Sequence, residues 1–257
     1  MILKNLSKCF ADLKVLEDFH LEIKEKEITC ILGPSGCGKS TLLNMISGIT
    51  TPDQGEIVGK KERIGYVFQE DRLLPWKTLE ENIRMVKKKG HPSEIRDLIE
   101  MVGLKNFEKS YPHQLSGGMR QRCAIARAYH YQSEMLLMDE PFKSLDYDLR
   151  MNMVKMLQDL WTKWGNTVVF VTHEIDEALL LGSRIILLRK NPCTVDQVIE
   201  IKTPQSQRTL TDNDLVRARE IIIDGMTNKK KRTCHHEKSA NDRINNGIND
   251  KLLCCLQ

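Results

Sequence analysis

The sequence has no long hydrophobic run. Its apolar segments are short strands or helix faces interrupted by charge, and none reaches the length of a membrane span. The first ten residues, MILKNLSKCF, also lack the apolar core of a secretory signal peptide. We therefore expect a chain that stays in the cytoplasm unless a partner brings it to a membrane.

Excess charge and paired cysteines are scarce as well. The formal net charge of +4 over 257 residues is too small to indicate nucleic acid as a partner by itself. The eight cysteines are scattered without paired spacing, so we interpret them as free thiols in a reducing compartment. We expect Cys30 and Cys123 in the core, and we expect Cys37 to be chemically accessible because it lies in a glycine-rich loop.

Short apolar strands alternate with helical patterns up to about residue 226. Strands are predicted at 27–32, 63–69, 135–140, 167–173 and 184–189. Helices are predicted at 39–49, 78–89, 92–103, 116–130 and 149–165. Because strands separated by helices favour parallel pairing, the pattern indicates a mostly parallel sheet covered on both faces. The first 25 residues and residues 193–203 are typical of antiparallel edge strands, and the basic segment 227–257 is predicted to be a mobile tail.

A glycine-rich loop, GPSGCGKS, lies between the predicted strand 27–32 and the predicted helix 39–49. Its spacing, with Gly33 and Gly38 followed by Lys39 and Ser40, fits a phosphate-binding loop. Glycines let backbone N–H groups converge on one anion, and the following helix adds the positive end of its dipole. The loop therefore predicts a nucleoside triphosphate, with Lys39 on the β- and γ-phosphates and the Ser40 hydroxyl on Mg²⁺. The alternative is a turn that binds nothing.

Two adjacent acids end the buried strand MLLMDE, at the position where open α/β sheets bind ligands. Neighbouring residues on a strand point to opposite faces, so Asp139 and Glu140 cannot share one role unless the strand has already turned. We predict Asp139 in the magnesium shell, and Glu140 as the base that orients an attacking water and takes its proton. The alternative is an acidic strand end with solvated side chains.

A second candidate anion site opens the predicted helix 116–130. Ser116 is a good N-cap residue, and Gly117 and Gly118 leave the first N–H groups of the helix uncovered. This site is distant in sequence from the glycine-rich loop, so the two are expected to be separate. The alternative is an ordinary capped helix after a turn.

These motifs together resemble the ATP-binding cassette subunits of ABC transporters, from residue 1 to about 225. GPSGCGKST is similar to the Walker A loop, LSGGMRQR to the signature motif, MLLMDEP to Walker B and SLD (144–146) to the D-loop. Gln69 matches the Q-loop and His173 the switch histidine. The resemblance implies an α/β P-loop NTPase fold in a domain of residues 1–226. The implied domain would have a RecA-like core with a mainly parallel sheet, an antiparallel β edge and a helical subdomain at about 78–130.

The resemblance also implies ATP and Mg²⁺ as cofactors and a head-to-tail dimer of two copies. Each ATP would lie between the Walker A loop of one copy and the signature motif of the other. The residues implied to bind nucleotide are Phe10, Gly33, Pro34, Ser35, Gly36, Cys37, Gly38, Lys39, Ser40, Thr41, Gln69, Ser116, Gly117 and Gly118. The residues implied in catalysis are Lys39, Glu140 and His173, and the implied metal ligands are Ser40, Gln69 and Asp139.

The segment QEDRLLPWKTLEENI, residues 69–83, resembles the importers for nitrate, sulfonate and taurine. Its apolar group at 73–76 is typical of contact with a permease, although these side chains could instead tuck into the helical subdomain. The implied function is an ATPase that powers small-solute uptake through a separate permease and, indirectly, a solute-binding protein. It would work at the cytoplasmic face of the membrane without nucleic acid.

Two alternatives to the importer subunit stay open. One is a soluble cassette ATPase that acts on ribosomes or DNA. The other is a regulatory cassette that binds ATP without hydrolysing it. Lys143, which stands where the family usually has a small residue, is the feature that favours the latter.

Overall fold

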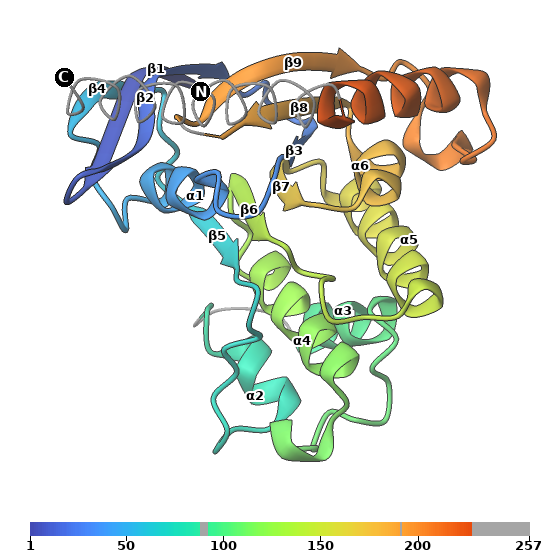
Figure 1. The fold of residues 1–257 in the computed structure, drawn as a ribbon. Helices are drawn as coiled ribbons and strands as arrows, with labels where there is room; N and C mark the ends of the chain where they lie inside the picture. The colour runs from blue at the N-terminus through green and yellow to red at the C-terminus, as the bar shows by residue number, and fades with distance from the viewer. Residues whose placement is uncertain (88–91, 191, 228–257) are drawn as a thin grey trace, which may run out of the picture.

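The computed structural model describes residues 1–87, 92–190 and 192–227, which form two sheets flanked by helices (Figure 1). The larger sheet has six strands in the order β5-β6-β7-β3-β8-β9. Its strands are β5 (Ile64–Val67), β6 (Met135–Asp139), β7 (Thr167–Thr172), β3 (Ile28–Leu32), β8 (Arg184–Arg189) and β9 (Thr194–Glu200). The first five strands are parallel, and β9 pairs antiparallel with β8.

A smaller antiparallel sheet lies beside the larger one. Its order is β2-β1-β4, with β2 at Leu13–Glu22, β1 at Ile2–Phe10 and β4 at Gln54–Val58. The α-helices are α1 (Lys39–Ser47), α2 (Leu79–Arg84), α3 (Pro92–Met101), α4 (Gly117–His130), α5 (Tyr147–Trp164) and α6 (Ile175–Leu181). Two 3₁₀ turns occur at Pro112–Gln114 and Gln205–Gln207, and residues 213–227 are also helical.

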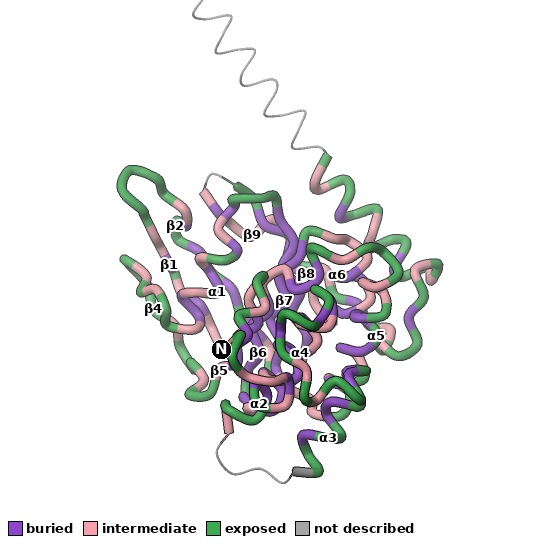
Figure 2. The backbone as a smooth tube through the Cα atoms, turned by 90° about the horizontal axis from the view of Figure 1, so that it is seen from below, coloured by how far each residue is buried: buried purple, intermediate pink, exposed green. Residues whose placement is uncertain are grey.

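Two hydrophobic cores sandwich the larger sheet, because side chains alternate across each strand. On β6, Leu137 joins the core beneath the antiparallel sheet and α1, whereas Leu136 and Met138 join the core shared with α4 and α5. Buried backbone accordingly follows the central strands in Figure 2. Burial on both faces explains why these strands read as continuous apolar runs.

Helix ends follow from local side-chain chemistry. The Ser116 side chain accepts a hydrogen bond from the Met119 N–H at the start of α4, and Asp146 caps α5 in the same way. Thr78 and Glu81 form a reciprocal capping box at the start of α2. Each such cap is worth about 1 kcal/mol, so these positions fix where the helices begin.

The predicted mostly parallel sheet with antiparallel edges is confirmed, and the structure adds to or shortens the other predicted elements. Strand β4, helix α6 and the helix at 213–227 were not predicted. The helix predicted at 78–89 is shorter, since α2 ends at Arg84, and residues 88–89 lie outside the described residues. The predicted tail also lies outside them, apart from Thr227. In the described part of the chain, no helix is both long and apolar enough to span a membrane.

Candidate nucleotide site

The candidate site lies where three neighbouring parallel strands end. Strand β7 pairs with β6 on one side and with β3 on the other, so their carboxyl ends meet at one edge of the sheet. The glycine-rich loop follows β3, Asp139 is the last residue of β6, and His173 follows β7. The fold thus brings together residues that are more than a hundred positions apart.

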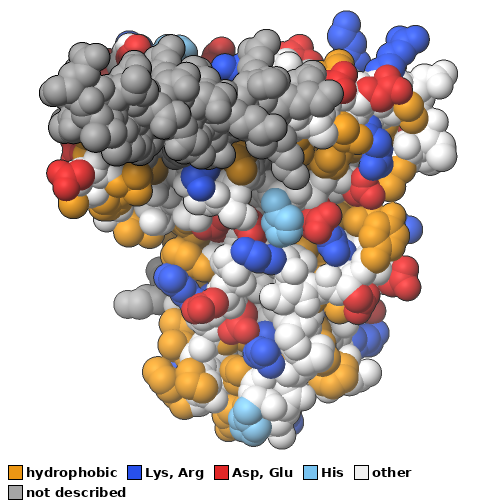
Figure 3. Space-filling view, viewed as in Figure 1, with side chains coloured by type: hydrophobic (Ala, Val, Ile, Leu, Met, Phe, Trp, Pro, Cys, Tyr) orange, Lys and Arg blue, Asp and Glu red, His pale blue; other side chains and the backbone are white. Residues whose placement is uncertain are grey.

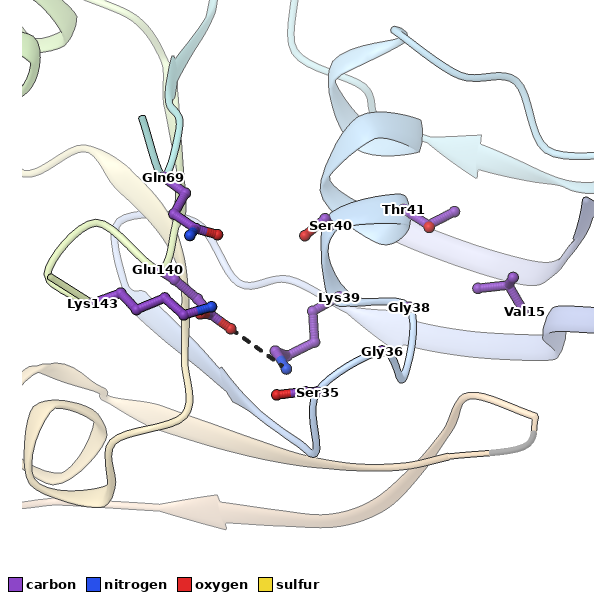
Figure 4. A pocket seen from close by; sticks show the side chains of 10 residues that line it. All are labelled: Val15, Ser35, Gly36, Gly38, Lys39, Ser40, Thr41, Gln69, Glu140 and Lys143. Carbon is purple, nitrogen blue, oxygen red and sulfur yellow. Dashed lines mark ion pairs between the residues drawn. The ribbon is translucent and has the colours of Figure 1, made fainter. Parts of the chain in front are cut away.

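The glycine-rich loop forms one wall of a cavity of about 300 Å³, the first cavity (Figure 4). Its described lining residues are Val15, Ser35, Gly36, Gly38, Lys39, Ser40, Thr41, Gln69, Glu140 and Lys143. Gly36 and Gly38 have φ angles of 71° and 103°, which glycine adopts without steric cost. A side chain at Gly38 would also collide with Val15, whose Cγ1 lies 2.8 Å from the Cβ position. The turn and its close packing therefore require glycine at position 38.

Lys39 is buried inside the loop, with 5% of its surface exposed. Its Nζ donates hydrogen bonds to the carbonyl oxygens of Gly33 (2.8 Å) and Pro34 (3.1 Å). The ammonium group therefore lies at the centre of the loop, at the first residue of α1. This is the position from which a lysine can contact phosphate oxygens held by the loop.

Asp139 lies opposite the start of α1 and accepts a hydrogen bond from Ser40. Burial raises the pKa of Asp139 above its ordinary value, and the hydrogen bond from Ser40 opposes that rise. A carboxylate, a hydroxyl and the nearby amide of Gln69 are hard oxygen donors of the type that Mg²⁺ binds together with substrate phosphates. The donor set therefore fits the predicted magnesium ion.

Glu140 resolves the question of how two adjacent acids can face one site. Its φ is 44°, in the left-handed region that glutamate rarely adopts, and its N–H donates to the Val171 carbonyl at 2.9 Å. The strand has therefore turned between Asp139 and Glu140. Figure 4 shows the Glu140 carboxylate pointing into the first cavity, toward Lys39.

Three nitrogen-bearing side chains surround the Glu140 carboxylate. Lys39 Nζ lies 3.8 Å from Oε1, while Lys143 Nζ lies 2.9 Å and His173 Nδ1 3.4 Å from Oε2. Burial alone would raise the pKa of Glu140, but these neighbours, Lys143 foremost, outweigh it and lower the pKa. Glu140 is therefore ionised at neutral pH, which a general base requires.

His173 contacts a further set of charged residues that the sequence analysis did not identify. Its Nε2 lies 3.6 Å from Glu174 Oε1, and Glu174 pairs in turn with Arg150 of α5. Buried Glu177 accepts a hydrogen bond from Thr172, the residue before His173. Burial raises the pKa of Glu177 to about 7. The only sequence signal for this support was the acidic start of α6.

Ser116, Gly117 and Gly118 line a separate space of about 430 Å³, the second cavity. Its other described lining residues are Gln69, Glu70, Asp71, Arg120, Gln121, Pro141, Ser144, Leu145, Asp146 and Leu149. Gln69 lines both cavities. The structure thus places Lys39 and Glu140 in the first cavity, with His173 beside Glu140, and keeps the signature residues in the second.

Cys37 and Phe10 differ from the other predicted nucleotide-binding residues. The expectation that Cys37 is accessible is wrong, because 3% of its surface is exposed and its thiol packs against buried Cys193. The hydrogen bond between these thiols lowers the pKa of Cys37 to about 7. Phe10 is half exposed at the end of β1 and is not among the described residues that line the first cavity.

The loop between β5 and α2 divides its apolar residues between the core and the surface. Leu73 is buried in the core with Leu79, so the expectation of one exposed group at 73–76 is wrong for this side chain. Trp76, by contrast, is 69% exposed. Buried Asn82 fixes the loop by hydrogen bonds to its backbone, including both the N–H and the carbonyl of Leu74. Hydrophobic side chains gather around α2 on the face shown in Figure 3.

The sequence matches known proteins along most of its length. The profile of the ABC transporter family matches residues 16–143. The aliphatic sulfonates import ATP-binding protein SsuB of Bacillus cereus is 42% identical over 211 residues, which cover 78% of this chain and 84% of that protein. The SsuB 2 protein of Burkholderia cenocepacia is 36% identical over 244 residues, which cover 91% and 88%.

Solved structures agree with these matches. The dimeric structure of MJ0796, a bacterial ABC transporter cassette, gives a TM-score of 0.69 at 33% identity, over 79% of this chain and 99% of that one. A dimer of the same cassette in a post-hydrolysis state, bound to ADP and Pi, gives a TM-score of 0.68 at 32% identity. The cavities described above therefore occur on a known ATPase fold, and this chain belongs to the ABC transporter family as an ATP-binding cassette.

Proposed function

We propose that this chain is the ATP-hydrolysing subunit of an importer for small aliphatic sulfonates. The observation that carries the proposal is the first cavity, where a phosphate-binding loop faces an ionised carboxylate across about 300 Å³. The solute class is supported by the relatives named as sulfonate import ATP-binding proteins, which match 78–91% of the chain. Nitrate and taurine are the neighbouring solute classes that the sequence resemblance includes.

The loop residues Gly33, Ser35, Gly36, Cys37 and Gly38 would hold the phosphates by backbone N–H groups, and Thr41 would add the hydroxyl of α1. Pro34 has no N–H and would only shape the loop. Lys39 would exchange its hydrogen bonds to the Gly33 and Pro34 carbonyls for phosphate oxygens. Cys37 would contribute only its backbone, because its side chain is turned into the core. Phe10 would stack on adenine at the exposed end of β1.

Ser40, Asp139 and Gln69 would hold Mg²⁺ beside the phosphates. The ion would supply positive charge that neutralises the phosphate oxygens. The raised pKa of Asp139 supports this assignment, because burial makes its charged form costly unless a cation accompanies it. Gln69 lines both cavities and would connect occupancy of the first to the position of the second.

Glu140 would accept the proton of the attacking water, and His173 would hold that water and the γ-phosphate. The distance of 3.4 Å between His173 Nδ1 and Glu140 Oε2 lets both groups contact one small molecule. Glu174 and Arg150 would keep the imidazole oriented. The low pKa of Glu140 makes it a modest base, so positioning of the water would carry much of the effect.

The second cavity would close over ATP held by another copy of the chain. Ser116, Gly117 and Gly118 present the start of α4, a 14-residue helix whose dipole favours an anion. Dimeric assembly of the cassette MJ0796, to which this chain is similar, supports a dimer. A head-to-tail arrangement would bring the second cavity of one copy to the first cavity of the other. ATP binding would close that dimer, and hydrolysis would reopen it.

The exposed surface around Trp76 would contact a membrane permease. Trp76 and Met85 expose 69% and 46% of their surfaces beside α2. We include residues 78–130 in a helical subdomain of the ATPase domain 1–226, and this part would transmit nucleotide state to the permease. A solute-binding protein would deliver the sulfonate from outside, and this chain would lie at the cytoplasmic face of the membrane.

Growth on a sulfonate as sole sulfur source tests this function. Deletion of the gene should abolish growth on an alkanesulfonate but not on sulfate, and uptake of radiolabelled sulfonate should stop. The wild-type chain should restore both, and Glu140→Gln should restore neither. Unchanged sulfonate uptake in the deletion strain would contradict the assigned solute, and nitrate and taurine uptake would then be measured. Neither the relatives named above nor the geometry favours a ribosome- or DNA-acting cassette or a non-hydrolysing one.

A further inference from the structure

A lysine outside the glycine-rich loop reaches into the first cavity. Lys143 belongs to the turn that follows β6, where its N–H lies 3.3 Å from the Glu140 carbonyl oxygen and donates to it. This turn folds the side chain back over Glu140, so Lys143 lines the same cavity as Lys39 and Ser40. Figure 4 shows Lys39 and Lys143 reaching toward the Glu140 carboxylate from opposite sides.

The two lysines differ in their freedom to follow a ligand. Lys39 is almost fully buried and is tied to loop carbonyls, whereas 43% of the Lys143 side chain is exposed. Lys143 Nζ makes an ion pair of 2.9 Å with Glu140 Oε2, and this contact raises the pKa of Lys143 above its ordinary value. The ammonium group is therefore charged, and its flexible stem lets it contact a second anion beside Glu140.

The charges of the first cavity suggest what the Lys143 ammonium group does there. Under the proposed function, the terminal phosphate of ATP lies near Glu140, so two anionic groups face each other. A cation that touches the carboxylate from the open side of the cavity reduces that repulsion. The β-phosphate, which ADP also carries, would be held by the loop and Lys39, so the second cation would act mainly on the γ-phosphate.

We propose that Lys143 is an additional γ-phosphate ligand, through which the first cavity distinguishes ATP from ADP. This inference rests on the proposed function, because it assumes that ATP occupies the first cavity. Lys143 thus adds to the affinity for ATP rather than supporting the regulatory, non-hydrolysing interpretation.

Equilibrium binding of two probes tests the assignment without turnover. The probes are the Mg²⁺ complexes of ADP and of β,γ-imido-ATP, which keeps a γ-phosphoryl group but is not hydrolysed. We expect Lys143→Ala to weaken imido-ATP binding about tenfold, which is one bidentate or charge-assisted contact, and ADP binding less than twofold. Lys143→Arg should stay within about threefold of wild type for both probes, because it restores the charge and the reach.

A charge-matched control distinguishes a direct contact between Lys143 and the γ-phosphate from the loss of one positive charge anywhere on the chain. Lys155→Ala removes the same charge from an exposed position on α5 and should leave both affinities unchanged. Equal losses of affinity for ADP and for imido-ATP in Lys143→Ala would overturn the proposal. Unchanged imido-ATP affinity with a lower kcat would also overturn it, because Lys143 would then act only by positioning Glu140. A wild-type chain that neither binds nor hydrolyses ATP would instead overturn the proposed function.

Discussion

The two cavities of this molecule are built from different chemistry, although they share Gln69. The first is lined by a buried lysine, one carboxylate, Glu140, and a second lysine, and a histidine lies beside Glu140. The second offers a serine hydroxyl and the glycine N–H groups at the start of α4. It is also lined by the acids Glu70, Asp71 and Asp146, and Asp71 is already paired with its arginine, Arg120. Under the proposed function, the first cavity would bind and activate phosphates, whereas the start of α4 in the second would only cap an anion.

This difference explains why one chain alone would be an incomplete ATPase. The charged residues to which we assign proton transfer lie at the strand ends, and the helix start that would complete the phosphate shell lines the second cavity. Turnover would therefore depend on a second copy, while binding would depend mainly on the first cavity. The predictions below separate these two contributions.

The largest effect should come from the base of the first cavity. Glu140→Gln keeps the size of the side chain and one accepting oxygen but cannot take a proton, so ATPase activity should fall at least about a hundredfold. Binding of Mg-ATP should persist, and the protein should elute as a dimer in gel filtration with ATP. Hydrolysis at the parental rate would show that Glu140 is not the base.

A smaller effect is expected from the second cavity. Ser116→Ala removes a hydroxyl from the anion cap and should lower ATPase activity about tenfold while single-chain ATP affinity stays within twofold. It also removes the N-cap of α4, which costs about 1 kcal/mol of stability.

Thr78→Ala is the matched control for the Ser116 variant, since Thr78 caps α2 in the same way and lines neither cavity among the described residues. It should lose similar stability, measured by urea unfolding, and retain activity. Equal loss of activity in both variants would assign the Ser116 effect to stability and would remove the second cavity from the mechanism.

Buried Glu177, which supports His173, should make the free energy of unfolding depend on pH. Glu177 has a pKa of about 7 in the fold and an ordinary pKa near 4.3 when unfolded, so the folded chain binds this proton more tightly. Its contribution to stability is therefore present below about pH 4.3 and is lost as the pH rises toward 7. Glu177→Gln should remove this loss and gain up to about 3 kcal/mol relative to wild type between pH 5 and pH 8.

Urea unfolding at both pH values measures this difference in the free energy of unfolding. The exposed variant Glu220→Gln, on the helix at 213–227, is the control and should show the wild-type pH dependence. If the free energy of unfolding depended on pH in the same way for wild type and Glu177→Gln, Glu177 would be ionised throughout the range.

The smallest effect on the isolated chain should come from the surface near α2. Trp76 is 69% exposed and lines neither cavity among the described residues, so Trp76→Ala should change ATPase activity less than twofold. Sulfonate uptake in cells should nevertheless fall, because the permease contact is lost. A large loss of activity in the isolated chain would place Trp76 in the ATPase mechanism instead.

Much of the first cavity was predictable because its motifs are local. The spacing of Gly33, Gly38 and Lys39 determines a loop conformation within eight residues, and the buried strand before Asp139 sets where the acids lie. Parallel pairing then brings the strand ends together. The fold class followed from the same alternation of strands and helices.

Other features depend on contacts that no local pattern encodes. Cys37 turns inward because Cys193, from the turn between β8 and β9, offers it a buried partner. Leu73 is drawn into the core by α2, while neighbouring Trp76 stays outside. The short strand β4 has little apolar character, and it forms because β1 provides an edge for pairing.

The left-handed backbone at Glu140 bears on how selection acts at this position. Such a conformation costs a non-glycine residue about 1 kcal/mol or more, and glycine or asparagine would adopt it more easily. Selection for thermal robustness alone would therefore tend to replace this glutamate. A glutamate in this left-handed conformation therefore indicates that stability is given up for activity at this position. Attempts to raise the thermal stability of the protein should leave Glu140 unchanged.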